Sequence, residues 1–177
     1  MAEKNERALG MLKTALSMEE KGYQFYEKVV ATSGNELGRR IFQMLKEDEI
    51  THVERIQRLF QQLSGGQDWT DDWKIVTVQQ RDLSQIFHRL AEEHRQRLSA
   101  EAGDLEAIDV GLDFELKAVN FYREHLAHAQ NELEREFIRA MVAEEELHHE
   151  LLADMKLYLT DPNAWFRERE KGGLDGA

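Results

Sequence analysis

The chain has 177 residues, of which 41% are hydrophobic, and a formal net charge of −12 at pH 7. This length and hydrophobic content predict a single domain that buries one core. The chain contains no cysteine, which excludes disulfides, thiolate metal sites and a thiol nucleophile, so a metal would be held only by nitrogen and oxygen. The acidic balance argues against a nucleic-acid partner and favours cations.

The hydropathy pattern predicts neither a leader nor a membrane span. The N-terminal segment MAEKNERALG lacks the apolar run of a signal peptide. No stretch approaches the roughly 18 apolar residues that cross a bilayer. We therefore expect a cytoplasmic protein without a membrane partner.

An internal repeat organises the chain. The single proline and the abundance of Glu, Leu, Ala, Arg and Gln favour helix, which predicts an all-α fold. Residues 16–60 align without gaps with residues 112–156, and 13 of the 45 positions are identical. Chance would give about three, at roughly one match in sixteen. The chain therefore contains two copies of one helical hairpin.

The first hairpin and the connection after it follow in chain order. Residues 6–63 should form two antiparallel helices that reverse near Gly34, a residue that favours turns. Residues 64–103 should form a long crossover that contains an extra helix over residues 82–100. Such a crossover returns the chain along the length of the bundle, so that the second hairpin lies beside the first in parallel sense.

The second hairpin and a tail complete the chain. Residues 104–160 repeat the pattern of two antiparallel helices, and residues 161–177 form a tail with a Gly-rich end. Trp165 and Phe166 of this tail should pack on the bundle or on a second subunit. The predicted fold is a four-helix bundle within a single domain, residues 1–177.

Each long predicted helix carries one apolar stripe at steps of three and four residues, and each stripe is interrupted by polar residues. The first and third helices place one Glu in the stripe. The second and fourth place a Glu and, three residues later, a His. The six polar stripe residues are Glu19, Glu49, His52, Glu115, Glu145 and His148.

The stretch EEELHH in the fourth helix offers two Glu-x-x-His pairs. Glu145 with His148 matches the corresponding pair of the first hairpin and lies on the apolar stripe, whereas Glu146 with His149 does not. In each hairpin the two Glu of the stripes are 30 residues apart. Each arm is then 15 residues, or ~22 Å long, which predicts that all four carboxylates meet at one level in the middle of the bundle.

Four carboxylates in an apolar core are costly unless their charge is compensated. Two divalent cations would balance them, and the two His would add neutral nitrogen ligands. Each Glu-x-x-His places an oxygen and a nitrogen on one helical face, and a Glu from a neighbouring helix would complete each position. Oxygen and imidazole ligands suit iron or manganese, although zinc also fits. A polar layer of Glu and His without metal is the structural alternative.

The sequence also resembles the rubrerythrins of the ferritin-like superfamily. The resemblance covers about residues 8–160, through MEEKGYQFY followed by EDEITHVERI and FELKAVNFY followed by AEEELHHELL. It implies a ferritin-like fold, and it implies that the six stripe residues bind two iron ions, with Glu49 and Glu145 as bridges. It also implies that Tyr26 and Tyr122 donate hydrogen bonds to the carboxylates.

Two departures from the rubrerythrin pattern limit what the resemblance implies. Full-length rubrerythrins carry a small iron centre held by four cysteines, and this chain has none, so electrons would come from a separate donor. Rubrerythrins also carry a second Glu three residues after the ligand of the third helix, and that position here is Ala118. A simpler six-ligand site of the ferroxidase type is therefore as well supported as a peroxidase.

Two further carboxylates precede the core Glu of the second and fourth helices. Asp48 and Glu144 could each orient a ligand His on the other hairpin, or they could simply be exposed.

The predicted function is that of a di-iron carboxylate protein with redox activity toward O₂, peroxide or ferrous iron, as a homodimer. Iron storage or metal handling without turnover is one alternative. A metal-dependent sensing or interaction module is another.

Overall fold

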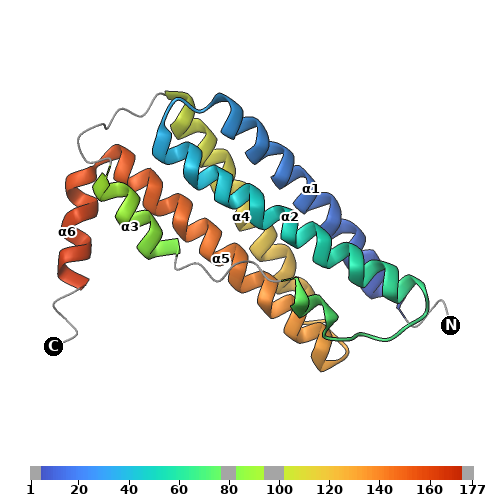
Figure 1. Cartoon of the computed structure of the whole chain (residues 1–177). Coiled ribbons are helices and arrows are strands. Elements are labelled where there is room, and N and C mark those ends of the chain that lie inside the picture. Colours follow the sequence, from blue (N-terminus) through green and yellow to red (C-terminus); the bar gives the residue numbers. More distant parts are fainter. Residues whose placement is uncertain (1–4, 77–82, 94–101, 173–177) are drawn as a thin grey trace.

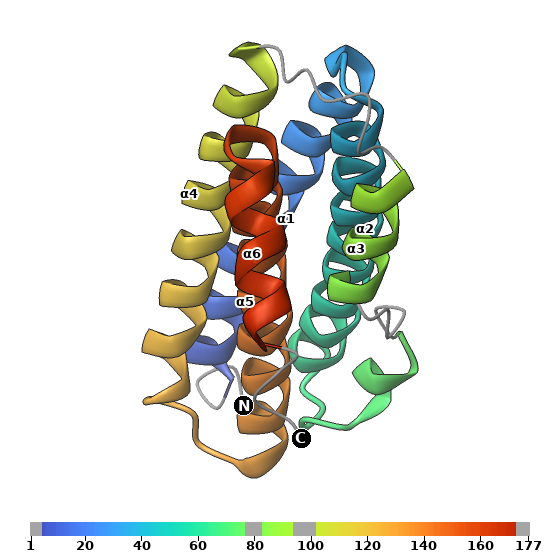
Figure 2. The same ribbon diagram turned by 90° about the vertical axis from the view of Figure 1, so that its left-hand side faces the viewer.

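The computed structural model describes residues 5–76, 83–93 and 102–172, which are mainly helical. Its long helices, α1 (Glu6–Thr32), α2 (Glu36–Ser64), α4 (Ala102–Leu126) and α5 (Glu132–Thr160), lie side by side (Figures 1 and 2). The shorter elements are η2 (Asp72–Ile75), α3 (Leu83–Glu93) and α6 (Pro162–Gly172). The described residues contain no strand, which confirms the all-α four-helix bundle. No helix in the described part of the chain combines the length and apolar composition needed to cross a membrane.

The repeated segment Asn-Glu-Leu begins the second helix of each hairpin. The side chain of Asn35 accepts a hydrogen bond from the backbone N–H of Gly38 at 2.9 Å, and that of Asn131 accepts one from Glu134 at 2.9 Å. Each Asn thereby caps a helix N-terminus and satisfies a backbone donor that has no partner within the helix. Helices α1 and α2 form one hairpin, and α4 and α5 form the other.

The two hairpins run in opposite senses, so the predicted parallel arrangement is wrong. Tyr26 of α1 contacts Glu115 of α4, while Tyr122 of α4 contacts Glu19 of α1. Residue numbers therefore rise in opposite directions along these two neighbouring helices. The repeat shows that the two hairpins are alike, but it does not specify how they are related in space. A translation or a two-fold rotation could relate them, and the structure has the rotation.

The crossover still returns the chain along the bundle. The Ser33 hydroxyl, at the turn between α1 and α2, donates to a carboxylate oxygen of Asp104 at 2.7 Å, which places the start of α4 at the end of the bundle opposite the end of α2. Helix α3 covers part of this path and packs on α5 and α2 (Figure 2). The predicted helix over residues 82–100 is thus seen as Leu83–Glu93, and residues 94–101 lie outside the described residues.

The apolar stripes form two core clusters, one toward each end of the bundle. One cluster contains the N-terminal part of α1 and includes Met11, Leu12, Ile56, Tyr122 and Met141. The other contains the C-terminal part of α1 and includes Tyr26, Phe42, Leu45, Ile108 and Leu152. The polar residues of the stripes lie between these clusters, which keeps them away from both open ends.

Helix α6 forms where the sequence indicated only a tail. The Asp161 carboxylate accepts a hydrogen bond from the backbone N–H of Ala164 at 2.9 Å, and Pro162 follows it at the first helical position. Trp165 is 1% exposed and packs edge-on against Phe87 of α3 and Tyr158 of α5. This aromatic contact attaches α6 to the bundle, whereas the predicted Gly-rich end, 173–177, lies outside the described residues.

Candidate metal centre

The six polar stripe residues meet in one layer at the middle of the bundle. Helices α1 and α4 each supply one carboxylate, and α2 and α5 each supply a carboxylate and an imidazole. All six residues are at most 3% exposed. They are Glu19, Glu49, His52, Glu115, Glu145 and His148. Every predicted ligand residue therefore reaches the same buried layer.

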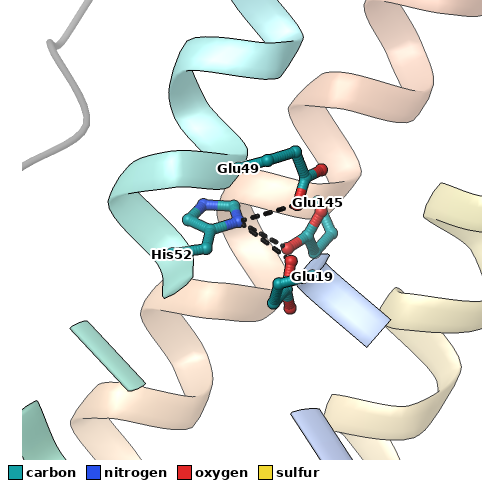
Figure 3. A group of neighbouring side chains, drawn as sticks. All are labelled: Glu19, Glu49, His52 and Glu145. Carbon is teal, nitrogen blue, oxygen red and sulfur yellow. Dashed lines mark hydrogen bonds and ion pairs between the residues drawn. The ribbon is translucent and has the colours of Figure 1, made fainter. Parts of the chain in front are cut away.

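The imidazole of His52 faces three carboxylates (Figure 3). Its Nδ1 lies 3.3 Å from Oε2 of Glu19, 3.1 Å from Oε1 of Glu145 and 3.9 Å from Oε2 of Glu49. These carboxylates come from three different helices, α1, α5 and α2. One nitrogen and several oxygens thus converge on one small volume.

The imidazole of His148 occupies the equivalent place in the other hairpin. Its Nδ1 lies 3.4 Å from Oε2 of Glu145 and 3.7 Å from Oε2 of Glu115. The two imidazole rings lie 5.5 Å apart, centroid to centroid, with an interplanar angle of 25°. The layer therefore has two similar halves, one around each His.

The donor atoms form two overlapping groups, each able to surround one cation. Glu19, Glu49, His52 and Glu145 offer ligand atoms that all lie within 4.8 Å of one another, and so do Glu49, Glu115, Glu145 and His148. Glu49 and Glu145 belong to both groups. Carboxylates shared in this way are suited to bridge two metal ions.

Several buried polar atoms in this layer have no hydrogen-bond partner among the described residues. They include Oε2 of Glu49, both carboxylate oxygens of Glu145 and Nδ1 of His148. A buried oxygen without a donor is unfavourable unless a cation or a water is bound to it. The donor set consequently fits a pair of divalent cations, for which carboxylate and imidazole are ordinary ligands.

Without metal, the electrostatic environment of the buried layer favours the binding of positive charge by its carboxylates. Burial raises the pKa of Glu49 well above its usual range, and the charges of Glu19 and Glu145 raise it further. Burial also raises the pKa of Glu115 to about 7, helped by Glu145 and opposed by His148. Without metal, protons must therefore supply part of the positive charge that the carboxylates require.

Each His has a carboxylate partner from the opposite hairpin on its other ring nitrogen. Nε2 of His52 lies 3.0 Å from Oε2 of Glu144, and Nε2 of His148 lies 3.4 Å from Oδ2 of Asp48. A carboxylate on Nε2 favours a proton on that nitrogen, which leaves Nδ1 available to the layer. The structure thus brings both of these predicted accessory carboxylates to the site.

Two tyrosines each donate a hydrogen bond from one hairpin to a carboxylate of the other. The Tyr26 hydroxyl donates to Oε1 of Glu115, and the Tyr122 hydroxyl donates to Oε1 of Glu19. Burial, together with the charge of the neighbouring carboxylates, raises the pKa of both phenols well above the usual value. Both phenols accordingly keep their protons and hold one oxygen of each terminal carboxylate, leaving the other oxygen free to face the layer.

A cavity of about 260 Å³ lies between α1 and α4 and reaches this layer. Met18, Phe114 and Phe121 form part of its wall, and the exposed Lys21 and Lys117 also line it. Four residues of the layer line it as well, namely Glu19, Glu49, Glu115 and Glu145. The cavity gives a small molecule a route to the centre of the bundle.

Gly22 makes room for the Glu49 carboxylate beside this cavity. A Cβ at this position would lie 3.1 Å from Cδ of Glu49 and 3.2 to 3.3 Å from its two oxygens. We predict that Gly22→Ala displaces this shared carboxylate and weakens divalent metal binding by about tenfold or more, in the range typical of changes around metal ligands. Isothermal titration calorimetry with Mn²⁺ measures the effect.

Gly10→Ala is the matched control for this change. Gly10 lies on the same helix, and a Cβ there would meet nothing within 4 Å. Its Ala variant should gain helix stability, by about 1 kcal/mol, and should bind metal as the parent protein does. Equal metal affinity in the two variants would contradict the role given to Gly22.

Sequence reasoning missed one residue that contributes to the layer. Arg55, 2% exposed, donates from Nη1 to Oε2 of Glu144 at 2.6 Å and from Nη2 to Oε1 at 3.3 Å. A signal was present, because Arg55 follows His52 by three residues and so lies on the same face of α2. The alternative pair, Glu146 with His149, is only partly buried and lies outside the layer, with Glu146 paired to Arg123 instead.

Comparison with known proteins agrees with this geometry. Residues 10–156 match the family model described as Rubrerythrin. Neither the curated protein sequences nor the solved structures include a significant match to the chain. The family model spans both hairpins and all six residues of the buried layer, and the chain belongs to the rubrerythrin family.

Proposed function

We propose that this protein is a di-iron carboxylate protein with redox activity toward O₂, peroxide or ferrous iron. The observation that carries this proposal is the pair of overlapping ligand groups that share Glu49 and Glu145. Glu19 with His52 and Glu115 with His148 would complete the two positions. Bound iron would supply the electron transfer, through its ferrous and ferric states.

The chain's own residues support such chemistry in three ways. The layer is buried, which strengthens the attraction between its carboxylates and a bound cation. Tyr26 and Tyr122 fix the outer carboxylates, whereas Glu49 and Glu145 have oxygens without hydrogen bonds, which leaves them free to shift as the charge at the centre changes. The cavity between α1 and α4 admits molecules of the size of O₂ or peroxide.

A ferroxidase is the second form of this function. Ala118 lines the cavity. At this position the resemblance to rubrerythrins leads us to expect a second Glu. The absence of a carboxylate side chain at this position favours the simpler six-ligand site and makes ferrous iron a candidate substrate beside peroxide. A peroxidase would need a separate electron donor for repeated reduction of the site, whereas in a ferroxidase the ferrous iron substrate would itself supply the electrons.

Anaerobic titration with ferrous iron tests the metal centre, and addition of O₂ or peroxide tests its reactivity. We expect two iron ions to bind per chain and to be oxidised when either oxidant is added. The double variant Glu49→Ala with Glu145→Ala should lose both properties. Binding well below two iron ions per chain, together with an unchanged double variant, would reject the di-iron centre.

Binding without oxidation would reject the redox activity and support metal handling or sensing. Storage would instead give a ferric mineral in a large hollow assembly, which iron loading followed by size-exclusion chromatography detects. Metal-dependent association without consumption of peroxide would indicate the sensing module. These three results distinguish the alternatives.

A further inference from the structure

The two halves of the buried layer differ outside the ligands. The 96-residue repeat pairs His52 with His148 and Glu144 with Asp48. It also pairs Arg55 with Leu151. Both copies of the repeat therefore supply a carboxylate that contacts a ligand His of the other hairpin. Only one copy supplies an Arg at the position that follows its His by three residues.

On the side of His52 the accessory carboxylate is neutralised. Two nitrogens of the Arg55 guanidinium contact the two oxygens of Glu144, at 2.6 and 3.3 Å. The third guanidinium nitrogen, Nε, donates to the backbone carbonyl of Val76 at 2.8 Å, and the group lies 5.7 Å from the ring centroid of Trp73. These contacts hold the cation in one place, so Glu144 and Arg55 together add almost no net charge behind His52.

On the side of His148 the accessory carboxylate, Asp48, lacks the kind of partner that Glu144 has in Arg55. Asp48 is 2% exposed, and among the described residues no Lys or Arg forms an ion pair with it. Its Oδ2 is buried and, within the described part of the chain, has His148 Nε2 as its near neighbour, at 3.4 Å. Leu151, in the place of the Arg, is buried in the apolar cluster that also contains Phe87 and Leu90 of α3. The carboxylate behind this ligand therefore has no Lys or Arg of the described residues to balance it, unlike Glu144.

A buried negative charge close to a ligand His makes the imidazole a stronger electron donor and attracts the metal ion directly. A neighbouring guanidinium opposes both effects. We infer that the two metal positions are inequivalent, that the position at His148 binds a divalent cation about tenfold or more tightly than the position at His52, and that Arg55 creates the difference. This inference rests on the proposed di-metal centre and adds a positioning residue, Arg55, which acts on the metal through Glu144 and His52.

Site-resolved affinities are needed to test the difference, because two nearby cations repel and would bind in two steps even at identical positions. His52→Ala leaves the position at His148, and His148→Ala leaves the position at His52. Isothermal titration calorimetry of each metal-free variant with Mn²⁺ alone gives the two affinities separately. We expect His52→Ala to bind about tenfold or more tightly than His148→Ala.

Arg55→Met then tests the cause. Added to His148→Ala, it should tighten Mn²⁺ binding by about tenfold, whereas added to His52→Ala it should have little effect. Arg58→Met is the matched control, because Arg58 is exposed on the same helix, and it should change neither affinity. Asp48→Asn in the His52→Ala background should weaken binding by about tenfold, which provides a test that does not depend on how well the Arg55 variant folds.

The results separate this inference from the proposed function. Equal affinities of His52→Ala and His148→Ala would overturn the inequivalence and leave the metal centre standing. Unchanged affinity on adding Arg55→Met to folded His148→Ala, as judged by circular dichroism, would overturn the role of Arg55. Failure of the parent protein to bind Mn²⁺ or ferrous iron would overturn the metal centre itself.

Discussion

Glu145→Gln is expected to destabilise the metal-free protein by about 3–5 kcal/mol, the usual cost of removing one partner from a buried ion pair. Glu145 lies within 3.4 Å of Nδ1 of both imidazoles, at 3.1 Å from His52 and 3.4 Å from His148. Burial acts to raise its pKa, but the positive charges of these two His outweigh burial and hold the pKa well below its usual range. Glu145 is therefore ionised, and its loss leaves two buried imidazolium groups without their shared partner.

Glu49→Gln is the matched control at the other shared carboxylate. Burial and the neighbouring Glu19 and Glu145 raise the pKa of Glu49 well above its usual range, which favours the protonated form of this side chain in the metal-free protein. Gln resembles a protonated Glu in shape, and the variant should lose little stability. Both variants should lose metal binding. Urea unfolding of chelator-treated proteins measures the difference, and equal destabilisation by the two changes would contradict this assignment of charge.

The stability of the metal-free protein should fall as the pH rises from about 5 to about 8. A carboxyl group whose pKa is raised on folding stabilises the folded state below its unfolded pKa, and this contribution is lost as the pH rises through the folded pKa. For Glu115 the pKa rises from 4.5 to about 7, which is worth about 3 kcal/mol. The raised pKa values of Glu49, His52 and His148 act in the same direction.

Metal should reverse this pH dependence. Ligands must lose their protons before they bind a cation, so metal affinity should increase over the same pH range. Thermal unfolding of metal-free and Mn²⁺-loaded protein at several pH values tests both trends. Glu115→Gln should flatten the decline of the metal-free protein, because the group that titrates near pH 7 is removed. A metal-free protein that is more stable at pH 8 than at pH 5 would contradict the account.

The sequence predicted the layer because its residues carry two independent signals. The apolar stripes placed Glu19, Glu115 and the two Glu-x-x-His pairs in the core, and the repeat placed them at one height. The distances from each His to its neighbouring carboxylates agree with this placement. Periodicity defines a helix face and equal spacing defines a level along the bundle, so together they locate the site from the sequence alone.

Features that depend on how separate helices pack against one another could not be predicted from periodicity and the repeat. The sense of the second hairpin depends on the symmetry axis, which two identical patterns do not specify. Arg55 lies on the same face of α2 as His52, but its partners, Glu144 and the carbonyl of Val76, come from other parts of the chain. Helix α6 did have a local signal, Asp161 followed by Pro162, but its position depends on the packing of Trp165 between α3 and α5.

Anomalous diffraction at the iron edge, from crystals of protein loaded anaerobically with ferrous iron, tests the central claim most directly. We predict two peaks per chain, one beside Glu19 and His52 and the other beside Glu115 and His148, with Glu49 and Glu145 between them. A single peak, or iron bound away from the four long helices while this layer remains free of it, would contradict a di-iron centre in this protein.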